Sequence, residues 1–179
     1  MSSVLFAVCL SAGTLVLGLV AFGPLTMLIF TVGFAGGLVL WLVTPSNGNW
    51  ADVKVPYWIA LFLFVLHRVE EKQFGFFDFL SNVTGASKPS TLSPTVLALV
   101  IVSVGAWSLI PPLMKRESPF GTYLAWTFFT SMGITELAHY LVFPWLNDRV
   151  FAYVPGMWTV IVLAPVAWWG MKRLALGRR

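Results

Sequence analysis

The sequence predicts an all-α protein: a single domain, residues 1–179, that forms a polytopic transmembrane helical bundle of about six spans. Of its 179 residues, 58% are hydrophobic and only 10% are charged, whereas soluble domains carry roughly 25% charged residues. Apolar segments recur along the chain, and each can cross the roughly 30 Å of bilayer hydrocarbon at about 1.5 Å per residue. We expect the spans at residues 4–21, 25–43, 56–76, 92–114, 120–145 and 151–176.

Turn residues set the boundaries between these spans. Gly23-Pro24 separates the first two spans, because this dipeptide breaks helices. The phenylalanine-rich run 74–80 is predicted either to lie at the membrane interface or to extend the third helix. Loops rich in glycine, proline, hydroxyl or charged residues are expected at 46–52, 81–94, 115–119 and 147–149.

Basic residues predict the orientation of the bundle. With six spans, most lysines and arginines fall on the side that holds both termini. Because positively charged loops are retained in the cytoplasm, both termini are expected to be cytoplasmic. The basic residues of that side are Lys54, Lys115, Arg116, Lys172, Arg173, Arg178 and Arg179, against Lys88 and Arg149 on the other side.

Composition also limits the partners. The net charge of +4 does not indicate nucleic acid, because basic residues at the ends of apolar segments serve topology and contact with anionic lipid headgroups. The expected partners are the lipid bilayer and an apolar small-molecule substrate. Apolar bundles of this size often dimerise, so a homodimer is left open. The one cysteine, Cys9, forms no intrachain disulfide.

Two histidine–glutamate clusters carry the strongest functional signal. The third span contains His67, Glu70 and Glu71, which fall within roughly a 100° arc of a helix. The fifth contains Glu136 and His139, three residues apart and therefore on one face. An ionisable residue at this depth costs several kcal/mol unless it is paired or solvated. A single Glu could form just a structural salt bridge to a neighbouring basic residue, but two His–Glu pairs inside apolar segments favour a functional site.

Imidazole and carboxylate are common ligands of zinc and iron. We therefore expect one or two divalent ions, zinc or iron. A di-iron site of the ferritin type uses roughly six side chains and this chain offers five, so a single ion is the economical model. Either Glu71 or Glu70 would act as general base, with Tyr140 beside the site, and which of the two glutamates faces inward stays open. The predicted ligands are His67, Glu70, Glu71, Glu136 and His139.

The run from His67 to Glu71, followed by Glu136 and His139, resembles the HXXEE-domain family of small prokaryotic integral membrane proteins. The resemblance covers the third to the fifth or sixth span. It implies a multi-span helical bundle in the inner (cytoplasmic) membrane and no particular activity. In site type alone, the sequence is similar to the sterol isomerases of the emopamil-binding group, which protonate an apolar substrate with His and Glu in a membrane cavity.

The expected function is a membrane-embedded, metal-dependent enzyme, a hydrolase or an oxidoreductase, that acts on a lipid, isoprenoid or other apolar substrate. One alternative is a metal-free isomerase or cyclase with a buried Glu as the acid. Another is a small transporter or proton-conducting protein, although the sequence shows no repeat of the transporter kind. A bis-histidine haem protein fits the nearby glutamates poorly. Candidates for an apolar pocket are Phe62, Phe64, Phe128, Phe129 and Met132.

Overall fold

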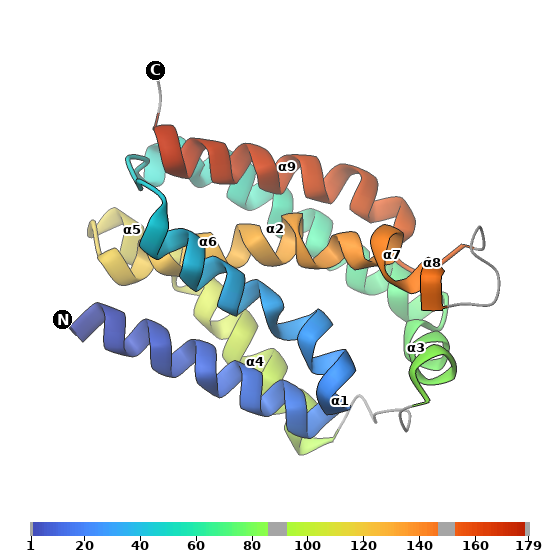
Figure 1. Ribbon diagram of the computed structural model, residues 1–179. Helices are drawn as coiled ribbons and strands as arrows, with labels where there is room; N and C mark the ends of the chain where they lie inside the picture. The colour runs from blue at the N-terminus through green and yellow to red at the C-terminus, as the bar shows by residue number, and fades with distance from the viewer. Residues whose placement is uncertain (1, 86–92, 147–152, 178–179) are drawn as a thin grey trace.

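The computed structural model describes residues 2–85, 93–146 and 153–177, and all regular structure in these ranges is helical. The predicted all-α bundle is thus confirmed (Figure 1). The helices are α1 (Ser2–Val43), α2 (Trp50–Gln73), α3 (Phe76–Thr84), α4 (Pro94–Ser108), α5 (Ile110–Lys115), α6 (Pro119–Gly133), η1 (Thr135–Leu137), α7 (Ala138–Leu141), α8 (Phe143–Leu146) and α9 (Met157–Leu176).

Helix α1 consists of two legs that fold back on each other at the predicted Gly23-Pro24 break (Figure 1). Gly23 has φ 75° and ψ 175°, which no helix accommodates. The second leg packs closely on α6: a Cβ atom at Gly33 would lie 2.8 Å from the Cα atom of Ser131. The absence of a side chain at this glycine therefore lets the two helices approach.

Successive helices run alternately between two ends of the bundle: first the two legs of α1, then α2, α4 with α5, α6 and α9 (Figure 1). We call the end that carries both termini the terminal end. The opposite end, which carries α3, α7 and α8, is the site end. Helix α6 runs through the middle, and nearly all of its side chains are buried.

Four helical stretches are long and apolar enough to cross a membrane: Ser2–Pro24, Trp50–Gln73, Pro94–Lys115 and Met157–Leu176. The outer surface of the bundle is also apolar. Large side chains such as Ile101 on α4 are exposed there, as a lipid environment requires. The protein is therefore a membrane protein.

The third predicted segment, 56–76, differs from α2 at both ends. The helix begins at Trp50 because Asn49 and Asp52 form a capping box. It ends at Gln73 because Gly75 adopts a left-handed conformation with φ 71°. The phenylalanine-rich run therefore does not extend the third helix, and most of it forms the separate helix α3.

The fifth predicted segment, 120–145, is broken, whereas we expected one continuous helix. Helix α6 ends at Gly133, whose carbonyl oxygen accepts a hydrogen bond from the indole N–H of Trp168 at 2.6 Å. The amide of Leu137 then bonds to the Ile134 carbonyl instead, at 3.2 Å. This shift from an i−4 to an i−3 partner starts the tighter turn η1, which is followed by α7 and α8.

Other expectations fall partly outside the described residues. The predicted starts of the segments 92–114 and 151–176 lie there, as do Lys88, Arg149, Arg178 and Arg179. Within the described part, the fourth segment has a turn at Leu109, just before Pro111 and Pro112, which lack the backbone N–H that a continuous helix needs.

Candidate metal centre

Two separate stretches of the chain bring four side chains together near the site end. His67 and Glu71 come from α2, Glu136 from η1 and His139 from α7. The Nε2 atom of His67 lies 3.1 Å from Glu136 Oε2 and 3.3 Å from Glu71 Oε1. The Nε2 atom of His139 lies 3.5 Å and 3.4 Å from the same two oxygens. All four residues are buried, and we call them the His/Glu centre.

The spacing within the His/Glu centre suits a single metal ion. A tetrahedral ion with bonds of about 2.0–2.1 Å holds its ligand atoms about 3.3 Å apart. The four nitrogen–oxygen distances, 3.1 to 3.5 Å, bracket that value. One donor atom from each residue lies within 4.8 Å of all the others. Two imidazoles and two carboxylates are also ligands that zinc and iron accept.

The hydrogen bonds of His67 fix which ring nitrogen faces the centre. Its Nδ1 atom lies 2.8 Å from Thr159 Oγ1, and that hydroxyl donates to Glu70 Oε2 at 2.6 Å. The same hydroxyl also lies 3.1 Å from the Gly156 carbonyl oxygen. A carboxylate and a carbonyl only accept, so the single hydroxyl proton of Thr159 serves them, and we assign Nδ1–H of His67 as the donor to the threonine. In the neutral ring, Nε2 therefore presents its lone pair to the centre, as a metal ligand must.

Arg68 orients both carboxylates of the centre. Its guanidinium donates to Glu71 Oε2 at 2.6 Å and to Glu136 Oε1 at 2.5 Å. These bonds hold one oxygen of each carboxylate, which leaves the other oxygen directed at the two histidines. The planar fork of arginine suits such bridging, which a lysine ammonium cannot reproduce.

Glu70 lies outside the His/Glu centre, although we predicted it as a ligand. Its carboxylate accepts hydrogen bonds from the backbone amides of Gly156, Trp158 and Thr159 at 2.9 to 3.2 Å. These amides belong to the first turn of α9, whose N-cap, Gly156, has no side chain to satisfy them. Glu70 thus caps α9 from a neighbouring helix, and we call this region the α9 cap.

The α9 cap reaches the surface through Tyr153. The hydroxyl of this half-exposed tyrosine donates to Glu70 Oε1 at 2.5 Å. Partial burial and this hydrogen bond raise the pKa of Tyr153 to about 12. The phenol therefore stays neutral and remains a donor to Glu70 at physiological pH.

Gly156 also contacts the His/Glu centre. It adopts φ 105°, and a Cβ atom there would lie 2.6 Å from His139 Cε1 and 2.7 Å from His67 Cε1. Only glycine permits both this backbone conformation and this approach to two imidazoles. Sequence reasoning missed Gly156, whose one signal is the Pro155-Gly156 pair inside the predicted segment 151–176, and it missed Thr159, which has no signal. Arg68 lies within the motif, where only a salt bridge to a glutamate is expected of it.

Tyr140 and most of the predicted pocket residues also lie away from the centre. The Tyr140 hydroxyl donates to the Met157 carbonyl at 2.5 Å and thereby ties α7 to the start of α9. Phe128 and Phe129 belong to the packed core, and Phe62 is 63% exposed on the outer surface.

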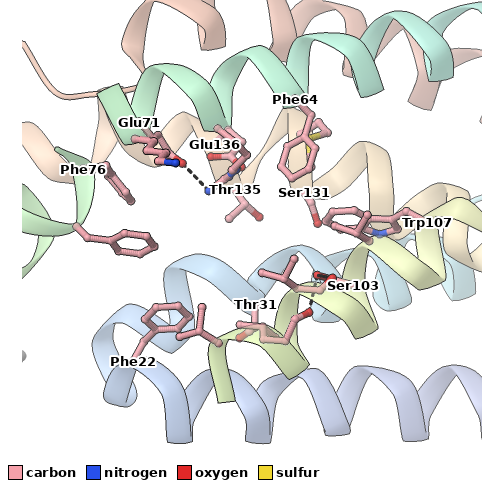
Figure 2. Close-up of a pocket in the computed structure, with 18 of the residues that line it drawn as sticks. Phe22, Thr31, Phe64, Glu71, Phe76, Ser103, Trp107, Ser131, Thr135 and Glu136 are labelled. Atoms are coloured by element: carbon pink, nitrogen blue, oxygen red, sulfur yellow. Dashed lines mark hydrogen bonds and ion pairs between the residues drawn. The ribbon is translucent and has the colours of Figure 1, made fainter. Parts of the chain in front are cut away.

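An apolar cavity of about 780 Å³ opens beside the centre, between α1, α2, α3, α4 and α6. Glu71 and Glu136 contribute to its wall, together with Arg68. Figure 2 shows Glu71 and Phe76 toward one end of the cavity and Trp107 at the other. Of the predicted pocket residues, Phe64 and Met132 do line it. The centre can therefore reach a molecule held in an apolar environment.

The fold and the site together define a helical membrane protein with a buried His/Glu centre. A family model described as "Protein of unknown function with HXXEE motif" matches residues 58–170. The chain belongs to this family, which confirms the resemblance drawn from the motif. No curated protein and no solved structure matches the chain.

Proposed function

We propose that this protein is a membrane-embedded, metal-dependent enzyme that acts on a lipid, isoprenoid or other apolar substrate. The observation that carries the proposal is the convergence of four buried donor groups, at the spacing of a tetrahedral ion, two of which (Glu71 and Glu136) also line an apolar cavity. Pockets of roughly 300–1,000 Å³ hold small-molecule ligands, and this cavity falls within that range.

Catalysis requires an open position on the metal, so three protein ligands suffice. In the proposal His67, His139 and Glu136 hold a zinc or iron ion, and Glu71 acts as general base. A divalent ion held there would supply Lewis-acid chemistry, or oxygen chemistry if it is iron. The 2.6 Å bond from Arg68 would keep the Glu71 carboxylate in position to act as the base. Because Glu71 lines the cavity, it would meet both the ion and the substrate.

We further propose that the chain crosses the inner (cytoplasmic) membrane of a prokaryote several times, with both termini in the cytoplasm. Both termini lie at one end of the bundle (Figure 1). Lys54, Lys115, Arg116 and Arg173 lie on helix ends at this same terminal end. The positive-inside rule supports this orientation, which would direct the site end away from the cytoplasm.

Elemental analysis tests the metal. Protein purified in detergent without chelators, and with any affinity tag removed, should contain about one zinc or iron per chain. His67→Ala and His139→Ala should each reduce this content to background. Tyr140→Phe, which alters a nearby residue outside the centre, is the matched control and should retain the metal. A metal-free wild type prepared in this way would refute the proposal.

Charge balance favours a second candidate, metal-free acid–base catalysis. The two carboxylates and the guanidinium of Arg68 sum to one negative charge, which one proton on His67 or His139 would neutralise. Such a centre could protonate an apolar substrate and return the proton. It predicts a wild type that is metal-free and retains its thermal stability in the presence of a chelator.

A further inference from the structure

The two ends of the cavity differ in chemistry. Lys72 and Asp78, from α2 and α3, line it at the site end, close to where Glu71 and Glu136 form part of its wall. The other end is lined by aromatic rings around Trp107, with the hydroxyls of Ser103 and Ser131 beside them (Figure 2). The charged groups therefore gather at the site end of the cavity, whereas a mainly apolar surface with a few hydroxyl groups extends toward the middle of the bundle.

Aromatic rings pack on one another at the Trp107 end of the cavity. The ring of Trp107 stacks on Phe34 with the centroids 5.6 Å apart and meets Phe64 edge-on at 5.9 Å. The indole N–H of Trp107 donates to Thr127 Oγ1 at 3.2 Å, which fixes the ring. A chain that enters from the site end therefore meets a single apolar wall.

The cavity is elongated along α4. Residues from Val96 to Trp107 line it, and this stretch of helix spans about 16 Å at about 1.5 Å per residue. This length is about half of the roughly 30 Å of hydrocarbon in a bilayer. The cavity thus extends from one membrane face to near the midplane, which is the depth that a lipid tail occupies.

We propose that the cavity binds a single-chain lipid amphiphile, such as a monoacylglycerol, tail first. The apolar tail lies along α4 and ends at Trp107. The polar head remains near Lys72 and Asp78, and the bond nearest the head lies beside Glu71 and Glu136. Because the cavity follows one helix, α4, we expect it to accept one chain and to exclude a two-chain phospholipid. The substrate class rests on the proposed function, whereas binding of the amphiphile does not require the metal.

Photocrosslinking tests the binding site. The probe is a monoacylglycerol with a diazirine at the methyl end of its palmitoyl chain, irradiated with the detergent-purified protein. Mass spectrometry should locate a label on Trp107, Phe34 or Phe64, and excess unlabelled monopalmitoylglycerol should compete it away. Labels spread over lipid-facing residues without competition would overturn the proposal, as would equal competition by a dipalmitoyl phospholipid.

Matched variants on one helix sharpen the test. Val104 lines the cavity, so Val104→Trp should shorten it. If the shortened cavity no longer buries two methylene groups of the lipid tail, binding should weaken about tenfold. Ile101→Trp places the same side chain three residues away, at a position 69% exposed on the outer surface, and should leave the competed label unchanged. If Val104→Trp does not fold, Ser103→Phe fills the same cavity. An unchanged label in a folded cavity variant would contradict the proposal.

Metal analysis of the same samples separates the two proposals. Both tryptophan variants should keep the metal of the wild type, because neither residue lies in the His/Glu centre. A competed label on a metal-free protein would refute metal dependence and leave lipid binding standing. Stoichiometric metal without a competed label would refute lipid binding alone.

Discussion

Glu70 and Glu71 are consecutive in the sequence, yet their carboxylates serve two different regions of the molecule. Glu71 belongs to the His/Glu centre, where it faces two imidazoles and a guanidinium. Glu70 belongs to the α9 cap, where it faces backbone amides. Successive residues of a helix point about 100° apart, so the paired glutamates of the motif can act on different neighbours.

The α9 cap supports the His/Glu centre. Thr159 accepts from His67 and donates to Glu70, and so joins the two regions through side chains. Gly156 joins them through the backbone, because its amide bonds to Glu70 while its Cα lies against both imidazoles. A change in the cap should therefore reach the centre, and this dependence can be tested.

The largest effect is expected from Gly156→Ala, which disturbs both regions. The added Cβ would strain a backbone at φ 105° and displace both histidine rings. Strain and overpacking each cost about 1–3 kcal/mol, so the free energy of unfolding should fall by about 2–6 kcal/mol, with loss of the proposed metal. Denaturant titration in detergent and elemental analysis measure the two effects.

Gly105→Ala is the control for this substitution. Gly105 lies inside α4, and a Cβ atom there meets nothing within 4 Å among the described residues. Alanine should therefore leave the metal content unchanged and stabilise the helix by about 0.5–1 kcal/mol. If Gly156→Ala kept both its free energy of unfolding and its metal content, the close contact between Gly156 and the two histidines would be wrong.

The paired substitutions Glu71→Gln and Glu70→Gln should separate the regions. Glu71→Gln removes a negative charge from the His/Glu centre and, if the centre holds the proposed metal, should weaken metal binding about 10–100-fold. Glu70→Gln removes charge-assisted bonds to the α9 amides, so the free energy of unfolding should fall by about 2–4 kcal/mol. Chelator competition measures the first effect and denaturant titration the second. The division of roles would be wrong if the two variants behaved alike in both measurements.

The smallest effect is expected from Thr159→Val, which removes only the link between the regions. His67 Nδ1–H then lacks its acceptor, and metal affinity should fall about tenfold. Thr159→Ser keeps the hydroxyl and should restore the affinity, whereas a purely steric role for Thr159 would affect both variants. Chelator competition in detergent distinguishes these outcomes.

Much of the architecture was predictable because membrane solvation leaves a strong pattern in the chain. Apolar length and low charge predicted the helical bundle, and Gly23-Pro24 predicted the break inside α1. The same scarcity of charge made His67, Glu71, Glu136 and His139 visible as candidates, since ionisable residues are costly inside apolar segments. These features are local, so the sequence alone determines them.

The rest depended on contacts between distant segments. Helical geometry could not show which of Glu70 and Glu71 faces the His/Glu centre, because one arc of the helix contains both. The position of α9 decided it. The end of α6 at Gly133 depends on the indole of Trp168, 35 residues later. Thr159 lies 92 residues from the histidine that it orients. Local propensity contains no information about such partners, so only the tertiary structure decides which groups complete the centre.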